Sequence, residues 1–123
     1  MNKEYVLYFW EQFSISIMQK IITEQEKKLA RFAKAMGHPT RIAILKFLVS
    51  QNECFFGDIH EMLPIAKATV SQHLSELKDS GLIQGEISPP KVKYCINPEN
   101  WALAKELFNE FMGTYNSCKF GCK

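Results

Sequence analysis

The placement of helix-ending residues is the feature that most restricts the fold of this chain. Gly37 and Gly81 each close a stretch in which apolar residues recur at helical spacing, and Pro64 breaks a shorter stretch between them. Two short runs rich in β-branched or apolar residues follow, Leu82 to Ile87 and Val92 to Ile96, with a proline-containing turn between them. The chain is therefore predicted to be mainly α, with one small β-hairpin late in the sequence.

Apolar residues spaced three or four apart predict a series of helices around this hairpin. Thr23 and Glu26 form a capping-box pattern at the start of one helix, and Pro39 suits the first turn of the next. The expected helices cover residues 1–22, Thr23 to Gly37, Pro39 to about Leu48, about Gly57 to Leu63, residues 67–80 and about 98–115.

The order of these elements is that of a winged helix-turn-helix, in which the second of two helices joined by a short turn enters the DNA major groove. At 123 residues the chain has room for one such core. We divide it into an apolar N-terminal extension (1–22), the winged helix-turn-helix domain (23–116) and a cysteine-containing tail (117–123). We expect the extension either to pack against a partner or to line a dimer interface. If translation starts at Met18, the residues before it do not belong to the protein.

Composition excludes several classes of protein. The formal net charge of +2 is too small to identify a nucleic-acid partner by itself, and the 4 cysteines are too unevenly spaced for a secreted disulfide scaffold. The longest apolar stretch, Tyr5 to Trp10, is far shorter than the roughly 20 residues that cross a bilayer. No nucleophile–base pair, glycine-rich phosphate loop or carboxylate dyad indicates an enzyme. We therefore expect a cytoplasmic protein without a membrane partner, and reduced thiols.

The helix over residues 67–80 carries the candidate DNA-reading surface. Val70, Leu74 and Leu77 form its buried stripe, and small polar side chains occupy the opposite face. Gln72 can pair with adenine through two hydrogen bonds, and the lysines of the hairpin can contact phosphate. The candidate DNA-binding residues are Lys67, Thr69, Ser71, Gln72, His73, Lys91 and Lys93. The alternatives are a solvated polar face or a winged helix that binds another protein.

Two motifs resemble one family. The run KAMGHPTRIAIL, residues 34–45, is similar to the signature that opens domains of the arsenical-repressor (ArsR/SmtB) family. The run ATVSQHLSELKDSGLI, residues 68–83, resembles the recognition helix of the same family, and the likeness extends over residues 30–97. The resemblance implies a homodimer joined through the first and last helices, an inverted-repeat DNA operator, and repression that an inducer relieves.

The last helix supports a dimer independently. Apolar residues cover more than half of its circumference, which exceeds what one domain face buries. A two-fold interface with a second copy would use the surplus, and a second buried layer within the chain is the alternative. The expected interface residues are Leu29, Phe32, Trp101, Leu103, Ala104, Leu107, Phe108 and Phe111.

The cysteines bear on the inducer. The family's common CxC sensor motif is half present, because Phe56 stands where the second cysteine would be, and the last helix has no histidine for the family's zinc site. Cys54, Cys118 and Cys122 remain as candidate thiolate ligands for As(III) or a soft divalent metal, which would be an inducer rather than an obligatory cofactor. The alternatives are a redox or persulfide switch, or no sensing at all.

Two further residues have simpler interpretations. Cys95 lies in a predicted strand between Tyr94 and Ile96, and we interpret it as structural. His60 is interpreted as an ordinary surface histidine rather than a ligand.

Overall fold

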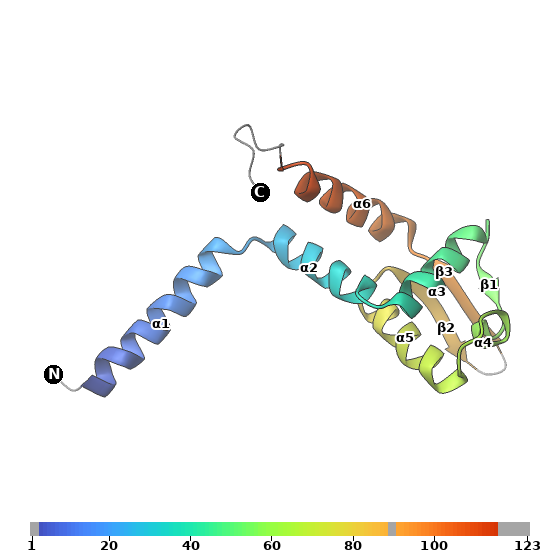
Figure 1. The fold of residues 1–123 in the computed structure, drawn as a ribbon, viewed down its shortest axis with the longest axis horizontal. Coiled ribbons are helices and arrows are strands. Elements are labelled where there is room, and N and C mark those ends of the chain that lie inside the picture. The colour runs from blue at the N-terminus through green and yellow to red at the C-terminus, as the bar shows by residue number, and fades with distance from the viewer. Residues whose placement is uncertain (1–2, 89–90, 116–123) are drawn as a thin grey trace, which may run out of the picture.

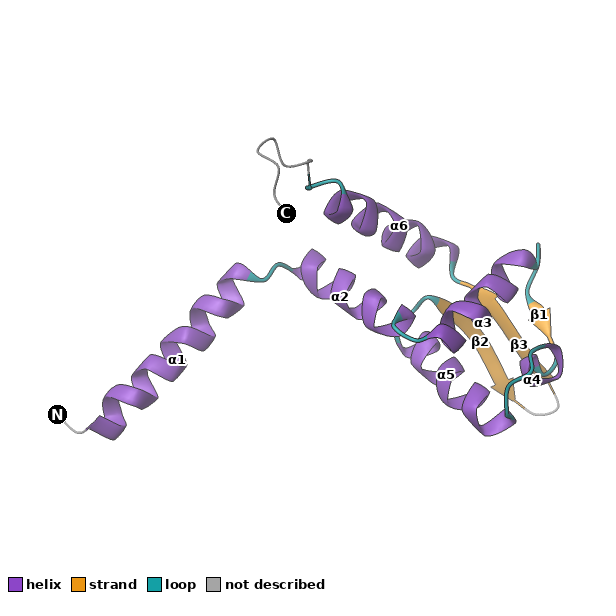
Figure 2. Cartoon of the chain, viewed as in Figure 1, coloured by secondary structure: helices purple, strands orange, loops and turns teal. Residues whose placement is uncertain are grey.

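The computed structural model describes residues 3–88 and 91–115 of the chain. They form helices and strands in the order expected, with one strand added (Figures 1 and 2). The elements are α1 (Lys3–Ile21), α2 (Glu24–Met36), α3 (Pro39–Ser50), β1 (Phe55–Phe56), α4 (Ile59–Met62), α5 (Lys67–Asp79), β2 (Ile83–Ser88), β3 (Lys91–Ile96) and α6 (Pro98–Met112).

Local chemistry sets the helix starts that the sequence predicted. The Thr23 backbone N–H donates to the Glu26 carboxylate at 2.9 Å, and the Glu26 N–H donates to the Thr23 hydroxyl at 3.1 Å, so the capping box of α2 is complete. At the start of α3, His38 Nδ1 accepts a hydrogen bond from the Thr40 N–H at 3.0 Å. Pro39 occupies the first turn of this helix, where its missing N–H costs nothing.

The sheet has three antiparallel strands in the order β1-β3-β2, rather than the two strands expected. The extra strand, β1, is two residues long and pairs Phe55 with Tyr94 and Phe56 with Lys93. A strand this short carries no alternation that a sequence pattern could show. The short helix α4 is correspondingly shorter than predicted, because part of the expected segment is the turn at Gly57, whose φ is 119°.

One hydrophobic core joins α2, α3, α5, the sheet and α6. Figure 2 shows α3 and α5 beside the strands, with α2 and α6 running side by side away from them. The core residues with the least exposure are Ala35, Ile44, Leu77 and Leu82, each at 0%. The helix α1 instead extends away from these elements (Figure 1). In the described residues, none of the helices is both long and apolar enough to cross a membrane.

The core corrects part of the predicted dimer interface. Phe32, Ala104 and Leu107 are buried within the single chain, so they cannot form the surface on which a second copy packs. For Ala104 and Leu107 of the last helix this agrees with the alternative, a second buried layer within the chain, and Phe32 of α2 packs in the same core. Leu29, Trp101, Leu103 and Phe108 are partly buried against the same core, and Phe111 is 58% exposed.

Candidate nucleic-acid interface

The helix α5 is held in place by its apolar stripe. Val70, Leu74 and Leu77 are all buried, and they place the opposite side of α5 in solvent. The side chains on that side are Lys67, Thr69, Ser71, Gln72 and Ser75, all exposed. A rigid helix that presents small polar groups and an amide has the size and the hydrogen-bonding chemistry to read base edges in the major groove.

Two polar contacts fix α5 against α2 and α3. The Arg31 guanidinium of α2 donates to the Glu76 carboxylate at 2.8 Å, and both side chains are about two thirds buried, with 35% and 29% exposed. Arg41 of α3 donates to the carbonyl groups of Lys34 and Ala35 at the end of α2 and to His73 Nδ1 of α5, the last at 3.2 Å. Arg41 therefore connects three helices.

The predicted DNA-binding residue His73 is placed differently from its neighbours. It is half-buried, and its ring lies 4.4 Å, centroid to centroid, from the ring of His38. Burial lowers the pKa of His73 below its ordinary value, and the neighbouring His38 and Arg41 lower that pKa further. A neutral His73 accepts the Arg41 hydrogen bond, so its first role in this structure is to anchor α5.

The hairpin of β2 and β3 forms the wing. Its strands pair from Ile83 opposite Ile96 to Ser88 opposite Lys91. Lys93 is exposed, stands opposite Glu86, and has its ammonium nitrogen 5.6 Å from the centre of the Phe56 ring. Lys91 begins β3, and its side chain lies outside the described part of the structure.

A glycine makes the connection from α5 to the wing possible. Gly81 has a φ of 83°, and its carbonyl accepts a hydrogen bond from the Asn100 amide of α6 at 2.9 Å. A Cβ at this position would lie 2.6 Å from that amide nitrogen. The turn thus fixes the angle between α5 and the wing.

The structure corrects the prediction that Cys54 has a free thiol. Cys54 forms a disulfide with Cys95, the strand residue interpreted above as structural. In this oxidised form the Cys54 sulfur is not a thiolate ligand. The other two predicted ligands, Cys118 and Cys122, lie outside the described residues. No spacing rule links positions 54 and 95, so the sequence carried no signal for the pair.

One further group of potential metal ligands occurs among the described residues. Ligand atoms of Asp58, His60 and Glu61 all lie within 4.8 Å of one another at the short helix α4. Acidic surface clusters of this kind are common without a metal. We therefore keep the interpretation of His60 as a surface histidine.

Comparison with known proteins identifies the family. The family model described as "Bacterial regulatory protein, arsR family" matches residues 38–84. The HTH-type transcriptional regulator YgaV of Escherichia coli is 30% identical over 73 residues, which cover 59% of this chain and 74% of YgaV. The chain belongs to the arsR family. Another relative, the HTH-type transcriptional regulator CmtR of Mycobacterium tuberculosis, is 32% identical over 80 residues, or 65% of this chain and 67% of CmtR.

Solved structures of other proteins share the fold. An ArsR-like regulator from Rhodococcus sp. RHA1 superimposes with a TM-score of 0.61 at 19% identity, covering 75% of this chain and 85% of that one. HlyU from Vibrio cholerae gives a TM-score of 0.57 at 25% identity, covering 73% and 97%. The winged helix-turn-helix prediction is confirmed, and the protein is a transcriptional regulator rather than an enzyme.

Proposed function

We propose that this protein is a homodimeric transcriptional repressor that binds a two-fold symmetric operator through α5 and the β2–β3 wing. The observation that carries the proposal is the division of α5 into a fully buried apolar stripe and an exposed polar face. A relative, the biofilm growth-associated repressor of Xylella fastidiosa, is 26% identical over 86 residues and supports repression rather than activation. The compartment we propose is the cytoplasm, where operator DNA is found.

The exposed side chains divide into two roles. Lys67 at the start of α5 and Lys93 on the wing supply charges for phosphate oxygens, which give affinity without sequence preference. Gln72, one turn into α5, supplies the donor and acceptor that match adenine in the major groove. Two copies of α5 in a dimer would then read half-sites about 34 Å apart, one turn of duplex.

The dimer we propose uses what remains exposed on α2 and α6. Phe111 and Met112 at the end of α6 are 58% and 68% exposed, and Leu29 of α2 lines a groove with Phe111. Together with the half-buried Trp101, Leu103 and Phe108, these side chains make the exposed side of α2 and α6 partly apolar, and contiguous exposed apolar patches often mark interaction sites. A two-fold copy of the same surface would cover it.

The inducer we propose is a soft metal or metalloid such as arsenite, bound by thiolates once the disulfide is reduced. The Cα atoms of Cys54 and Cys95 are 4.4 Å apart, so reduction would leave two adjacent thiols, and sulfur ligands select soft ions. Cys118 and Cys122 are further candidate ligands beyond the described residues. A redox mechanism is the second candidate, because the disulfide itself favours it.

Operator binding is tested by fluorescence anisotropy on the protein's own promoter fragment at several salt concentrations. Gln72→Ala should weaken binding by about 1–3 kcal/mol and relax the preference at one base pair. Lys67→Ala should weaken all sequences alike and lower the slope of affinity against salt by about one ion. Gln12→Ala, an exposed glutamine of α1, is the matched control. Normal operator binding by Gln72→Ala would place the recognition surface elsewhere.

The inducer is tested on the same complex. Arsenite added to the fully reduced protein should release the DNA at near-stoichiometric concentration, and Cys54→Ser should need far more arsenite. Cys118→Ser with Cys122→Ser tests whether the tail contributes ligands. Release that is unchanged in all of these variants would remove thiolates from the mechanism.

A further inference from the structure

The disulfide occupies a defined place in the sheet. Phe56 faces Lys93 and Phe55 faces Tyr94, so Cys54 and Cys95 stand at the next facing position of the same ladder. The Gly57 N–H donates to the Val92 carbonyl at 3.1 Å, and bonding alternates along an antiparallel pair. The position of Cys54 and Cys95 is therefore a non-hydrogen-bonded one, where Cα atoms come closest, in agreement with the 4.4 Å observed.

The bond is the covalent attachment of a very short strand. With two residues, β1 has few ladder hydrogen bonds of its own, and β3 is the strand that joins it to the wing. Phe56 of β1 carries the exposed ring over which the ammonium group of Lys93 lies. Opening the disulfide would leave β1 held by its short ladder, by this contact and by Phe55, whose ring packs edge-on against Phe47 at the core. The position of Lys93, a candidate phosphate contact, would become less fixed.

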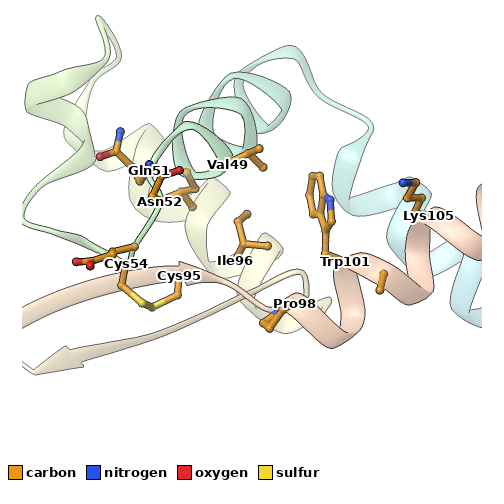
Figure 3. A pocket seen from close by; sticks show the side chains of 12 residues that line it. Val49, Gln51, Asn52, Cys54, Cys95, Ile96, Pro98, Trp101 and Lys105 are labelled. Atoms are coloured by element: carbon orange, nitrogen blue, oxygen red, sulfur yellow. A yellow bond between two sulfur atoms is a disulfide. The ribbon is translucent and has the colours of Figure 1, made fainter.

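The disulfide is also open to small molecules. A groove of about 560 Å³ lies between the end of α3, β3 and the start of α6, and both cysteines line it. Figure 3 shows the sulfur–sulfur bond at one end of the groove, with Val49, Ile96 and Trp101 projecting from three different elements. Glu53 and Lys105 add charged groups to the lining. Both cysteines are partly exposed rather than sealed in the core.

We propose that Cys54 and Cys95 are a thiol–disulfide exchange site that a low-molecular-weight thiol reaches through this groove. The exchange changes the affinity of the wing for DNA. A thiolate of the small thiol attacks one sulfur, forms a mixed disulfide and expels the other cysteine as a thiolate. A second molecule of the thiol attacks the mixed disulfide, releasing the symmetric small disulfide. The two protons of the small thiols end on Cys54 and Cys95, and the reverse reaction with the small disulfide restores the bond.

The compartment supports a reversible role. A regulator that binds operator DNA works among the thiols of the cell interior, where lasting structural disulfides are rare and those that form are mostly transient or sensing. A partly exposed disulfide that lines a groove is accessible to exchange, whereas a disulfide sealed in the core is not. The effect on DNA rests on the operator binding proposed above. The oxidised form, with β1 and β3 tied, is the one organised in advance for binding.

The exchange itself is measured on the full chain with Cys118→Ser and Cys122→Ser, so that only this pair reports. Equilibration in buffers of glutathione and glutathione disulfide, followed by alkylation and mass spectrometry, should show full conversion between the two forms. Ala102→Phe adds bulk to the lining of the groove and should slow reduction by glutathione several-fold. Glu106→Phe, on the same helix and outside the groove lining, is the matched control and should leave the rate unchanged.

The consequence for DNA is measured by anisotropy on the promoter fragment. The oxidised form should bind at least about fivefold more tightly than the reduced form, and Cys54→Ser with Cys95→Ser should bind like the reduced form in either buffer. If circular dichroism shows that this variant does not fold, the test is the comparison of DNA affinity between the oxidised and reduced forms of the protein that keeps both cysteines. Equal affinities of the two forms, or equal reduction rates for Ala102→Phe and Glu106→Phe, would overturn the proposal. If neither form binds DNA, operator binding fails, while the exchange rates still decide whether the groove serves the disulfide.

Discussion

The helices α1 and α5 have apolar residues at the same spacing of three and four, yet those residues are buried in α5 and exposed in α1. In α5 the apolar residues Val70, Leu74 and Leu77 are all buried. In α1 the residues Phe9 and Trp10 are 61% and 60% exposed, although they are larger. The comparison shows that apolar periodicity predicts a helix but does not predict what the helix packs against.

The distribution of polar residues explains the difference. The apolar side chains of α5 form one stripe, so burying them leaves a polar face for solvent. In α1, tyrosine and leucine side chains lie on the faces between the main apolar positions, so burying one face leaves another exposed. Its aromatic rings pack mainly along the helix, with Phe9 and Trp10 both about 6 Å from Phe13 (6.2 and 6.1 Å between ring centres). Local contacts of this kind hold a helix but do not position it.

The largest effect should come from emptying the α5 stripe. Leu77 has 0% exposure, so Leu77→Ala removes buried methyl groups and leaves a cavity, at a cost of about 2–5 kcal/mol in the free energy of unfolding. Urea denaturation measures it, and Ser75→Ala on the exposed face of α5 is the control, expected within about 0.5 kcal/mol. A loss as small as the control's would mean that α5 is not fixed by the core.

A smaller effect should come from the polar attachment of α5. The pKa of His73 is lowered in the folded chain, so between its ordinary value near 6.5 and the lowered value the unfolded chain binds the extra proton. The free energy of unfolding should therefore fall as the pH is lowered through this window. His73→Gln keeps an acceptor for Arg41 and removes the titrating group, so this part of the pH dependence should disappear in urea melts recorded from pH 7.5 downward.

In that comparison His38 and Arg41, the groups that face His73, are unchanged. If the free energy of unfolding of His73→Gln depended on pH in the same way as that of the unsubstituted protein, another residue would be responsible for the proton uptake.

The smallest effect should come from α1. Phe9→Ser combined with Trp10→Ser removes two large exposed side chains, and the free energy of unfolding of the domain should change by less than about 0.5 kcal/mol. Urea denaturation at two protein concentrations is the measurement. A loss above about 1 kcal/mol that shrinks on dilution would show that a second copy buries α1, and α1 would then resemble α5 in having its apolar residues covered.

The sequence predicted the parts of this structure that depend on neighbours along the chain. The capping box at Thr23, the stop at Gly81 and the polar face of α5 are all encoded within a few residues. The strand β1 and the contact from Arg41 to His73 were missed, because each depends on which distant segments meet. The burial of Phe32 was misassigned for a related reason: periodicity identifies an apolar face, but not whether that face meets its own chain or another.

The disulfide has a mechanical consequence as well. Its two cysteines are 41 positions apart, so the oxidised chain contains a closed covalent ring that holds α4, α5 and β2. A force applied to the two termini passes through the bond and not around the ring. In a single-molecule pulling experiment the oxidised protein should therefore be shorter at full extension by about 140 Å than the reduced protein, at roughly 3.5 Å per residue. The segment that contains α5 would remain unstretched until the bond is cut.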